Sequence, residues 1–165
     1  MSPAAARQEI LEFGTAFEAS AKVPFRATFE VRGVPKGQPR PRATIRGKHA
    51  GVYDPGTATN WKHAVILEGR SLRPSTPLEV PVCVSIEFHL PRPKRLTRRS
   101  DPAGIVWSIS KPDIDNLAKA VLDALVQDGW FVDDSLIVEL HARKVYHPKA
   151  GVPGARIEIS EASSP

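Results

Sequence analysis

The sequence predicts a single compact domain of the mixed α/β (α+β) class, in which helices pack on one face of a mostly antiparallel mixed sheet. Its length of 165 residues fits one domain with a substantial core. The expected elements follow one another as strand, hairpin, helix, strand, helix, strand and strand, an order typical of this class. Apolar residues alternate within the expected strands and recur at helical spacing within the helices.

The composition indicates a cytoplasmic protein with a polyanionic partner. With 23 Lys and Arg against 18 Asp and Glu, the formal net charge is +5, which favours attraction to nucleic acid. Cys83 is the single cysteine, so we expect no disulfide framework within one chain and no oxidising compartment. No apolar run approaches the roughly 18 residues of a membrane span. The start also lacks a signal-peptide pattern, and we expect no membrane association.

Residues 1–22 are expected to form an N-terminal extension to a domain at residues 23–162. We interpret the extension as a short helix or an arm, because it is rich in Ala and Glu and its apolar face is weak. That face comprises Ile10, Leu11, Phe13 and Phe17. Residues 25–33 then alternate apolar and polar side chains, which predicts a half-buried strand.

A basic, proline-rich segment follows at residues 33–42. Six Lys or Arg and no acid lie from Arg32 to Lys48. Prolines at positions 35, 39 and 41 oppose ladder pairing and hold the segment extended, so a stiff loop would present its cations to phosphates. These cations are Lys36, Arg40 and Arg42. A merely solvated basic loop is the alternative.

A hairpin, a helix and a long strand are predicted next. The hairpin covers residues 44–53 and turns about Gly47, and the helix runs from Asp54 to about Leu72. The strand covers residues 78–90 and places every second apolar residue on one face. Those residues are Val80, Val82, Val84, Ile86 and Phe88.

Two aromatic residues in this region have alternative interpretations. Tyr53 and Trp61 are candidates for stacking on exposed bases. An aromatic residue at helical spacing is more often part of the core, and we expect Trp61 there.

A second proline-stiffened basic loop spans residues 91–99 and carries five positive residues. It leads to the acidic segment, so we expect Arg92, Lys94 and Arg95 to hold a substrate strand on a loop flexible enough to close. A solvated linker is the alternative.

Several carboxylates and lysines lie close together in the segment that begins at Lys111. Pro112 disfavours helical geometry at Lys111, so the chain should enter extended and turn helical near Asp113. If the transition falls between Asp113 and Asp115, both carboxylates can reach one point. Apolar residues then recur at helical spacing and predict a helix that ends at Gly129. They are Leu117, Val121, Leu122 and Leu125.

Converging carboxylates raise one another's pKa unless a cation lies between them. All-oxygen ligation suits Mg²⁺. A lone Cys83 and five scattered His are not expected to make a zinc cluster. The alternative is an ordinary surface ion pair between Asp115 and Lys119, with Asp133 and Asp134 forming only a turn.

Two further strands are predicted after the acidic segment. Residues 135–146 alternate Leu136, Val138 and Leu140 with polar residues, and residues 155–160 form the last strand. A turn-rich connection at residues 148–154 joins them.

Three stretches around the acidic residues form one pattern. They are Lys-Pro-Asp-Ile-Asp-Asn-Leu-Ala-Lys-Ala from Lys111, Leu-Asp-Ala-Leu from Leu122, and Gly-Trp-Phe-Val-Asp-Asp-Ser from Gly129. This pattern resembles the signature of the RusA family of Holliday junction resolvases, found in bacteria and prophages. The resemblance implies that metal is held by Asp113, Asp115 and Asp134, and that Lys119 is catalytic or contacts phosphate. Asp133 also matches, but adjacent residues in an extended segment face opposite ways, so only one of this pair is expected to be a ligand.

The resemblance also implies a function. Members of the family are magnesium-dependent homodimeric endonucleases that resolve four-way DNA junctions by paired symmetric nicks in recombination and repair, and Mn²⁺ is expected to substitute. The basic loops would then contact the DNA backbone, through Lys36, Arg40, Arg42, Arg46, Arg92, Lys94 and Arg95. The alternatives are a nuclease for other branched replication intermediates and a non-catalytic basic DNA-binding module.

Overall fold

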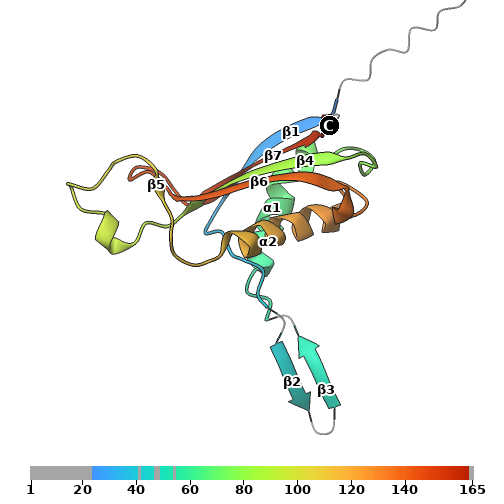
Figure 1. The fold of residues 1–165 in the computed structure, drawn as a ribbon, viewed down its shortest axis with the longest axis horizontal. Coiled ribbons are helices and arrows are strands. Elements are labelled where there is room, and N and C mark those ends of the chain that lie inside the picture. Colours follow the sequence, from blue (N-terminus) through green and yellow to red (C-terminus); the bar gives the residue numbers. More distant parts are fainter. Residues whose placement is uncertain (1–23, 41, 47–48, 54, 164–165) are drawn as a thin grey trace, which may run out of the picture.

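A five-stranded sheet with two helices on one face forms the body of the protein (Figure 1). The computed structural model describes residues 24–40, 42–46, 49–53 and 55–163. The expected N-terminal extension lies outside these residues. The strand order is β1-β7-β4-β6-β5. The strands are β1 (Arg26–Arg32), β4 (Val82–Leu90), β5 (Val106–Trp107), β6 (Ile137–Tyr146) and β7 (Gly154–Glu161).

The pairing confirms the predicted mixed, mostly antiparallel sheet. β7 pairs antiparallel with both β1 and β4, and β5 pairs antiparallel with β6. Among the strand pairs of this sheet in the described residues, β4 and β6 are the parallel pair. Parallel neighbours need a long crossover connection, and the helix α2 (Ile114–Gln127) lies within it.

The core lies between the sheet and the helices. On β4, buried and half-buried residues alternate without exception. The buried set faces α1 and α2 and consists of Val82, Val84, Ile86, Phe88 and Leu90. No helix of the described residues covers the opposite face (Figure 1), so polar side chains there remain accessible to water.

The first helix is shorter than predicted. α1 covers Thr59–Gly69 and continues as the 3-10 turn η1 (Arg70–Leu72). The expected start at Asp54 is wrong, because Gly56 has a φ of 69° and cannot belong to a right-handed helix. Trp61 is buried, which confirms its assignment to the core. No helix in the described ranges is long and apolar enough to cross a bilayer.

The second helix follows its prediction closely. Leu117, Val121 and Leu125 are buried on the face that meets the sheet and α1. Gly129 has a φ of 76° and ends the helix, and the N–H of Trp130 then donates to the Leu125 carbonyl.

β6 differs from its prediction in start and burial. The 3-10 turn η3 (Asp134–Leu136) precedes it, so the strand begins at Ile137. β5 pairs with Val145 and Tyr146 alone, and the rest of β6 is an edge of the sheet. Val138 and Leu140, predicted as its apolar face, are 59% and 45% exposed at this edge.

The predicted hairpin is confirmed in its pairing. β2 (Arg42–Arg46) and β3 (His49–Tyr53) are antiparallel, with Arg46 opposite His49. Figure 1 shows this two-stranded sheet projecting away from the body on the side of the helices.

Candidate active site

The segment that leads into α2 is hydrogen-bonded to residues at the end of β6. Lys144 Nζ donates to the carbonyls of Ser110 and Pro112 at 2.9 and 2.8 Å. The hydroxyls of Ser110 and Tyr146 are also hydrogen-bonded, at 2.6 Å. These contacts hold the extended chain in place just before the helix begins.

The predicted transition from extended to helical backbone falls at Asp113. Asp113 is the N-cap residue with φ −71° and ψ 147°, and Asp115 lies in the first turn. Both carboxylates are exposed, and neither has a hydrogen bond or ion pair to any described residue. The positive end of the helix dipole favours negative charge here. Two carboxylates without a described partner therefore belong to the N-cap and the first turn of α2.

The first basic loop docks beside these carboxylates. The N–H of Gln38 donates to the Asn116 carbonyl at 2.8 Å. The loop approaches closely because residue 37 is glycine. A Cβ at this position would lie 3.1 Å from Asn116 Cβ, which is tighter than most real contacts.

Cations and a carboxylate line one open hollow at this junction. Its volume is about 570 Å³, and it is bordered by Gly37, Gln38, Arg40, Lys111, Pro112, Asp113 and Asn116. Arg40 and Lys111 are exposed. Such a mixed lining suits a phosphodiester, since cations attract the phosphate while carboxylates bind a metal. Lys111 and Asn116 belong to the sequence pattern, which by itself predicts no role for either, and both border the hollow.

Lys119 lies one helical turn beyond Asp115. Its Nζ is 3.5 Å from Asp123 Oδ1, and Lys62 Nζ is 3.0 Å from Asp123 Oδ2. The alternative ion pair between Asp115 and Lys119 is not formed. Lys119 is 61% exposed at its side chain, so it can leave this loose pair to contact a phosphate.

The two adjacent aspartates after α2 have different environments. Asp133 Oδ1 accepts a hydrogen bond from the N–H of Ser135 at 2.9 Å. Hydrogen bonds from the side chain and the backbone of Ser135 lower the pKa of Asp133 below its usual value. Asp134 is exposed, and its carboxylate has no partner within the described part of the chain. Asp133 thus caps the turn, whereas Asp134 is available to a ligand.

Asp113 and Asp134 lie at opposite ends of α2. The segment leading into the helix is tied to the end of β6 by Lys144, whereas η3 leads into the start of β6. Figure 1 shows the segment before α2 and the turn after it at opposite ends of the helix. A helix of 14 residues is on the order of 20 Å long. One copy of the chain does not bring all the predicted carboxylates to one cation.

The second basic loop is held by hydrogen bonds from Arg92 within it and from Lys149 outside it. Arg92 donates to the carbonyls of His147 at 2.7 Å, of Leu96 at 2.9 Å, and of Gly104. Lys149 Nζ donates to the Asp101 carbonyl at 2.7 Å. These hydrogen bonds connect the loop to neighbouring segments, and the guanidinium of Arg92 donates to three backbone carbonyls.

The other predicted DNA-contacting residues lie on the two basic loops and on β2. Lys36, Lys94 and Arg95 are exposed. Arg42 and Arg46 lie on β2, but their side chains are outside the described part of the structure.

Comparison with known proteins gives one family and several relatives. The model of the family "Endodeoxyribonuclease RusA" matches residues 32–160. A protein from Bacillus subtilis (strain 168), named "Uncharacterized protein YqaN", is 33% identical over 141 residues, covering 82% of this chain and 96% of its own length. "Crossover junction endodeoxyribonuclease RusA" of Aquifex aeolicus (strain VF5) is 30% identical over 115 residues, covering 69% of this chain and 79% of its own. The protein of that name from Lactococcus phage r1t is 42% identical over 55 residues, covering 33% and 40%.

Proposed function

The chain belongs to the RusA family of endodeoxyribonucleases, and on this premise we propose that it resolves four-way DNA junctions by magnesium-dependent, paired symmetric nicks. The observation that carries the proposal is the unpartnered carboxylate of Asp113, which borders a hollow together with Arg40 and Lys111. Asp115 adds a second unpartnered carboxylate in the first turn of α2. We assign the activity to residues 23–162. We further propose that the protein acts in the bacterial cytoplasm and that either the bacterium or a prophage encodes it.

The residues at the start of α2 fit a hard divalent cation. Their free donors are carboxylate oxygens, which suit Mg²⁺ or Mn²⁺. Asp113 and Asp115 would hold the ion, with Asp134 as a further ligand. Mg²⁺ typically takes one or two carboxylates plus substrate phosphate oxygens, and the open hollow leaves room for such a phosphate.

The chemistry divides between the bound ion and the side chains. When bound, Mg²⁺ would activate water and neutralise charge that develops on the phosphate. Arg40 and Lys111 attract the DNA backbone to the hollow. Lys119, on the next turn of α2, would leave Asp123 and stabilise negative charge in the transition state.

The separation of Asp113 from Asp134 supports a homodimer. If Asp134 contributes to the metal site, it must come from a second copy of the chain, because its own α2 keeps it on the order of 20 Å away. A two-fold dimer would complete two such sites in matching orientations. Paired nicks on opposite strands of a junction require that arrangement.

Cleavage of a synthetic four-way junction tests the proposal. We expect nicks at symmetric positions with Mg²⁺ or Mn²⁺ and none with EDTA, whereas a linear duplex of the same arm sequence remains intact. Comparable nicking of the linear duplex would contradict junction specificity. Preferred cleavage of flaps or forks would identify other branched replication intermediates as the substrate, and binding without any nicking would identify a non-catalytic module.

A further inference from the structure

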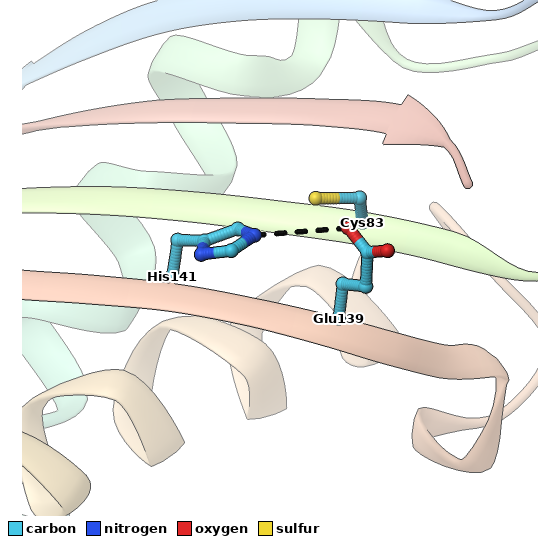
Figure 2. Close-up of side chains that lie close together, drawn as sticks. All are labelled: Cys83, Glu139 and His141. Atoms are coloured by element: carbon cyan, nitrogen blue, oxygen red, sulfur yellow. Dashed lines mark ion pairs between the residues drawn. The ribbon is translucent and has the colours of Figure 1, made fainter. Parts of the chain in front are cut away.

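A second cluster of ligand-type side chains lies on the face of the sheet that carries no helix. Cys83 comes from β4, and Glu139 and His141 come from β6 (Figure 2). One ligand atom of each side chain lies within 4.8 Å of the other two. His141 Nε2 is 3.7 Å from Glu139 Oε2. Within the described ranges, no other group of three His, Cys, Asp or Glu residues meets this criterion.

The strand register explains the cluster. Val82 pairs with Ile137, but Cys83 pairs with Glu139, so the register shifts by one residue between them. This irregularity places Cys83 beside Glu139, and not beside Val138, on the same face of the sheet. His141 follows Glu139 by two residues and therefore points the same way. Bulges of this kind often re-aim a side chain at a functional site.

The donor set differs chemically from that at the start of α2. A thiolate, an imidazole and a carboxylate are ligands of Zn²⁺, which accepts three protein ligands and leaves a fourth position for water or another group. Thiolate and carboxylate together would also balance the charge of a divalent cation. Mg²⁺ disfavours a sulfur ligand. From a lone Cys83 and five scattered His we expected no zinc cluster, but strand pairing brings Cys83 and His141 into one group of ligand-type side chains.

The cluster is open to solvent. Glu139 and His141 are exposed and Cys83 is half-buried. His141 also borders an open hollow of about 540 Å³ over β4, β6 and β7. An ion could therefore reach the three ligands without unfolding of the sheet.

We propose that Cys83, Glu139 and His141 form a separate metal site that binds Zn²⁺ or a similar borderline-soft divalent cation. The site lies on the opposite face of the sheet from α2 and does not depend on the proposed nuclease function. A simple Glu139–His141 ion pair beside an uninvolved thiol is the competing explanation of the same geometry.

Titration of the reduced, metal-free full chain with Co²⁺ distinguishes the two explanations. Co²⁺ replaces Zn²⁺ in such sites and gives a thiolate-to-metal absorption band. Because the chain has one cysteine, any such band reports Cys83. We expect the band to saturate at one equivalent, to persist in excess Mg²⁺, and to persist in Asp113→Asn.

Single variants then identify the other ligands. Cys83→Ser should abolish the band, and both His141→Gln and Glu139→Gln should weaken Co²⁺ and Zn²⁺ binding. His63→Gln is the matched control, since His63 is exposed on α1, away from the cluster. A missing band in the wild type would overturn the proposal. So would a band that both His141→Gln and Glu139→Gln leave unchanged, which would indicate adventitious binding to the thiol alone.

Discussion

The backbone N–H of Gln38 donates a 2.8 Å hydrogen bond to the carbonyl of Asn116. This contact joins the basic loop to the first turn of α2, about 80 residues further along the chain. It places the cations of the loop next to Asp113, and it gives the loop a defined position beside the proposed metal ligands.

The first prediction concerns the close approach of the loop to α2. Gly37→Val should displace the loop, because even a Cβ would lie 3.1 Å from Asn116 Cβ. Overpacking should cost about 1–3 kcal/mol of stability. Displacement of the loop cations from the hollow should also lower junction cleavage by about tenfold for each 1.4 kcal/mol of transition-state stabilisation that is lost. The measurement is single-turnover nicking with Mg²⁺. Gly104→Val is the matched control, since a Cβ there meets no atom within 4 Å. Equal effects of the two substitutions would argue against a specific role for the loop position.

The second prediction concerns the carboxylates at the start of α2. Asp113→Asn and Asp115→Asn should each reduce nicking by at least about a hundredfold, since metal ions supply several kcal/mol of transition-state stabilisation. Junction binding, measured by gel shift in Ca²⁺ or EDTA, should be unchanged or tighter because repulsion of phosphate is reduced. Cleavage at the wild-type rate by either variant would refute the metal-site assignment.

The third prediction follows from the position of Asp134. Asp113→Asn and Asp134→Asn should each be inactive, but mixed and refolded together they should regain about a quarter of the wild-type sites if subunits pair at random. In the mixed dimer, one site receives both substitutions and the other receives neither. Mixing Asp113→Asn with Asp115→Asn should restore nothing, because these residues come from the same chain. Absence of rescue in the first mixture would show that Asp134 is not supplied by a second copy.

The fourth prediction distinguishes the roles of Arg40 and Arg92, which have the same charge. Arg40→Ala should reduce the slope of log affinity against log salt by nearly 0.9, the value for one lost phosphate contact. Arg92→Ala should chiefly destabilise the loop, because Arg92 donates to the carbonyls of His147, Leu96 and Gly104. Binding at several salt concentrations and thermal unfolding of both variants test this. The assignment fails if Arg92→Ala changes the slope and Arg40→Ala does not.

The fifth prediction concerns pH. The hydrogen bonds from Ser135 lower the pKa of Asp133 from 3.8, so the folded state favours the ionised carboxylate. This contribution to stability is present above the unfolded-state pKa and is lost as the pH falls through the lower folded-state pKa. Asp133→Asn should therefore differ from the wild type in unfolding midpoint near neutral pH, and the difference should shrink in acid. A difference that persists at the lowest pH would exclude ionisation as its cause.

Local features were predictable from the sequence because they depend on residues close together in the chain. The apolar spacing of Leu117, Val121 and Leu125 defined the buried face of α2, and Gly129 marked its end. Pro112 placed the change from extended to helical backbone at Asp113. The mostly antiparallel sheet also followed from alternation and from the order of the elements.

The tertiary structure alone decided which distant residues meet. It placed residues 33–40, and not the loop that leads to the acidic segment, against the start of α2. It directs the guanidinium of Arg92 to backbone carbonyls. It also separates Asp134 from Asp113 by the length of a helix, and strand pairing brings Cys83 close to His141. Periodicity reports which way a side chain points along its own element, but register and docking arise from packing between elements. For that reason the sequence alone identified residues that can bind a metal, whereas only the tertiary structure showed which of them lie together.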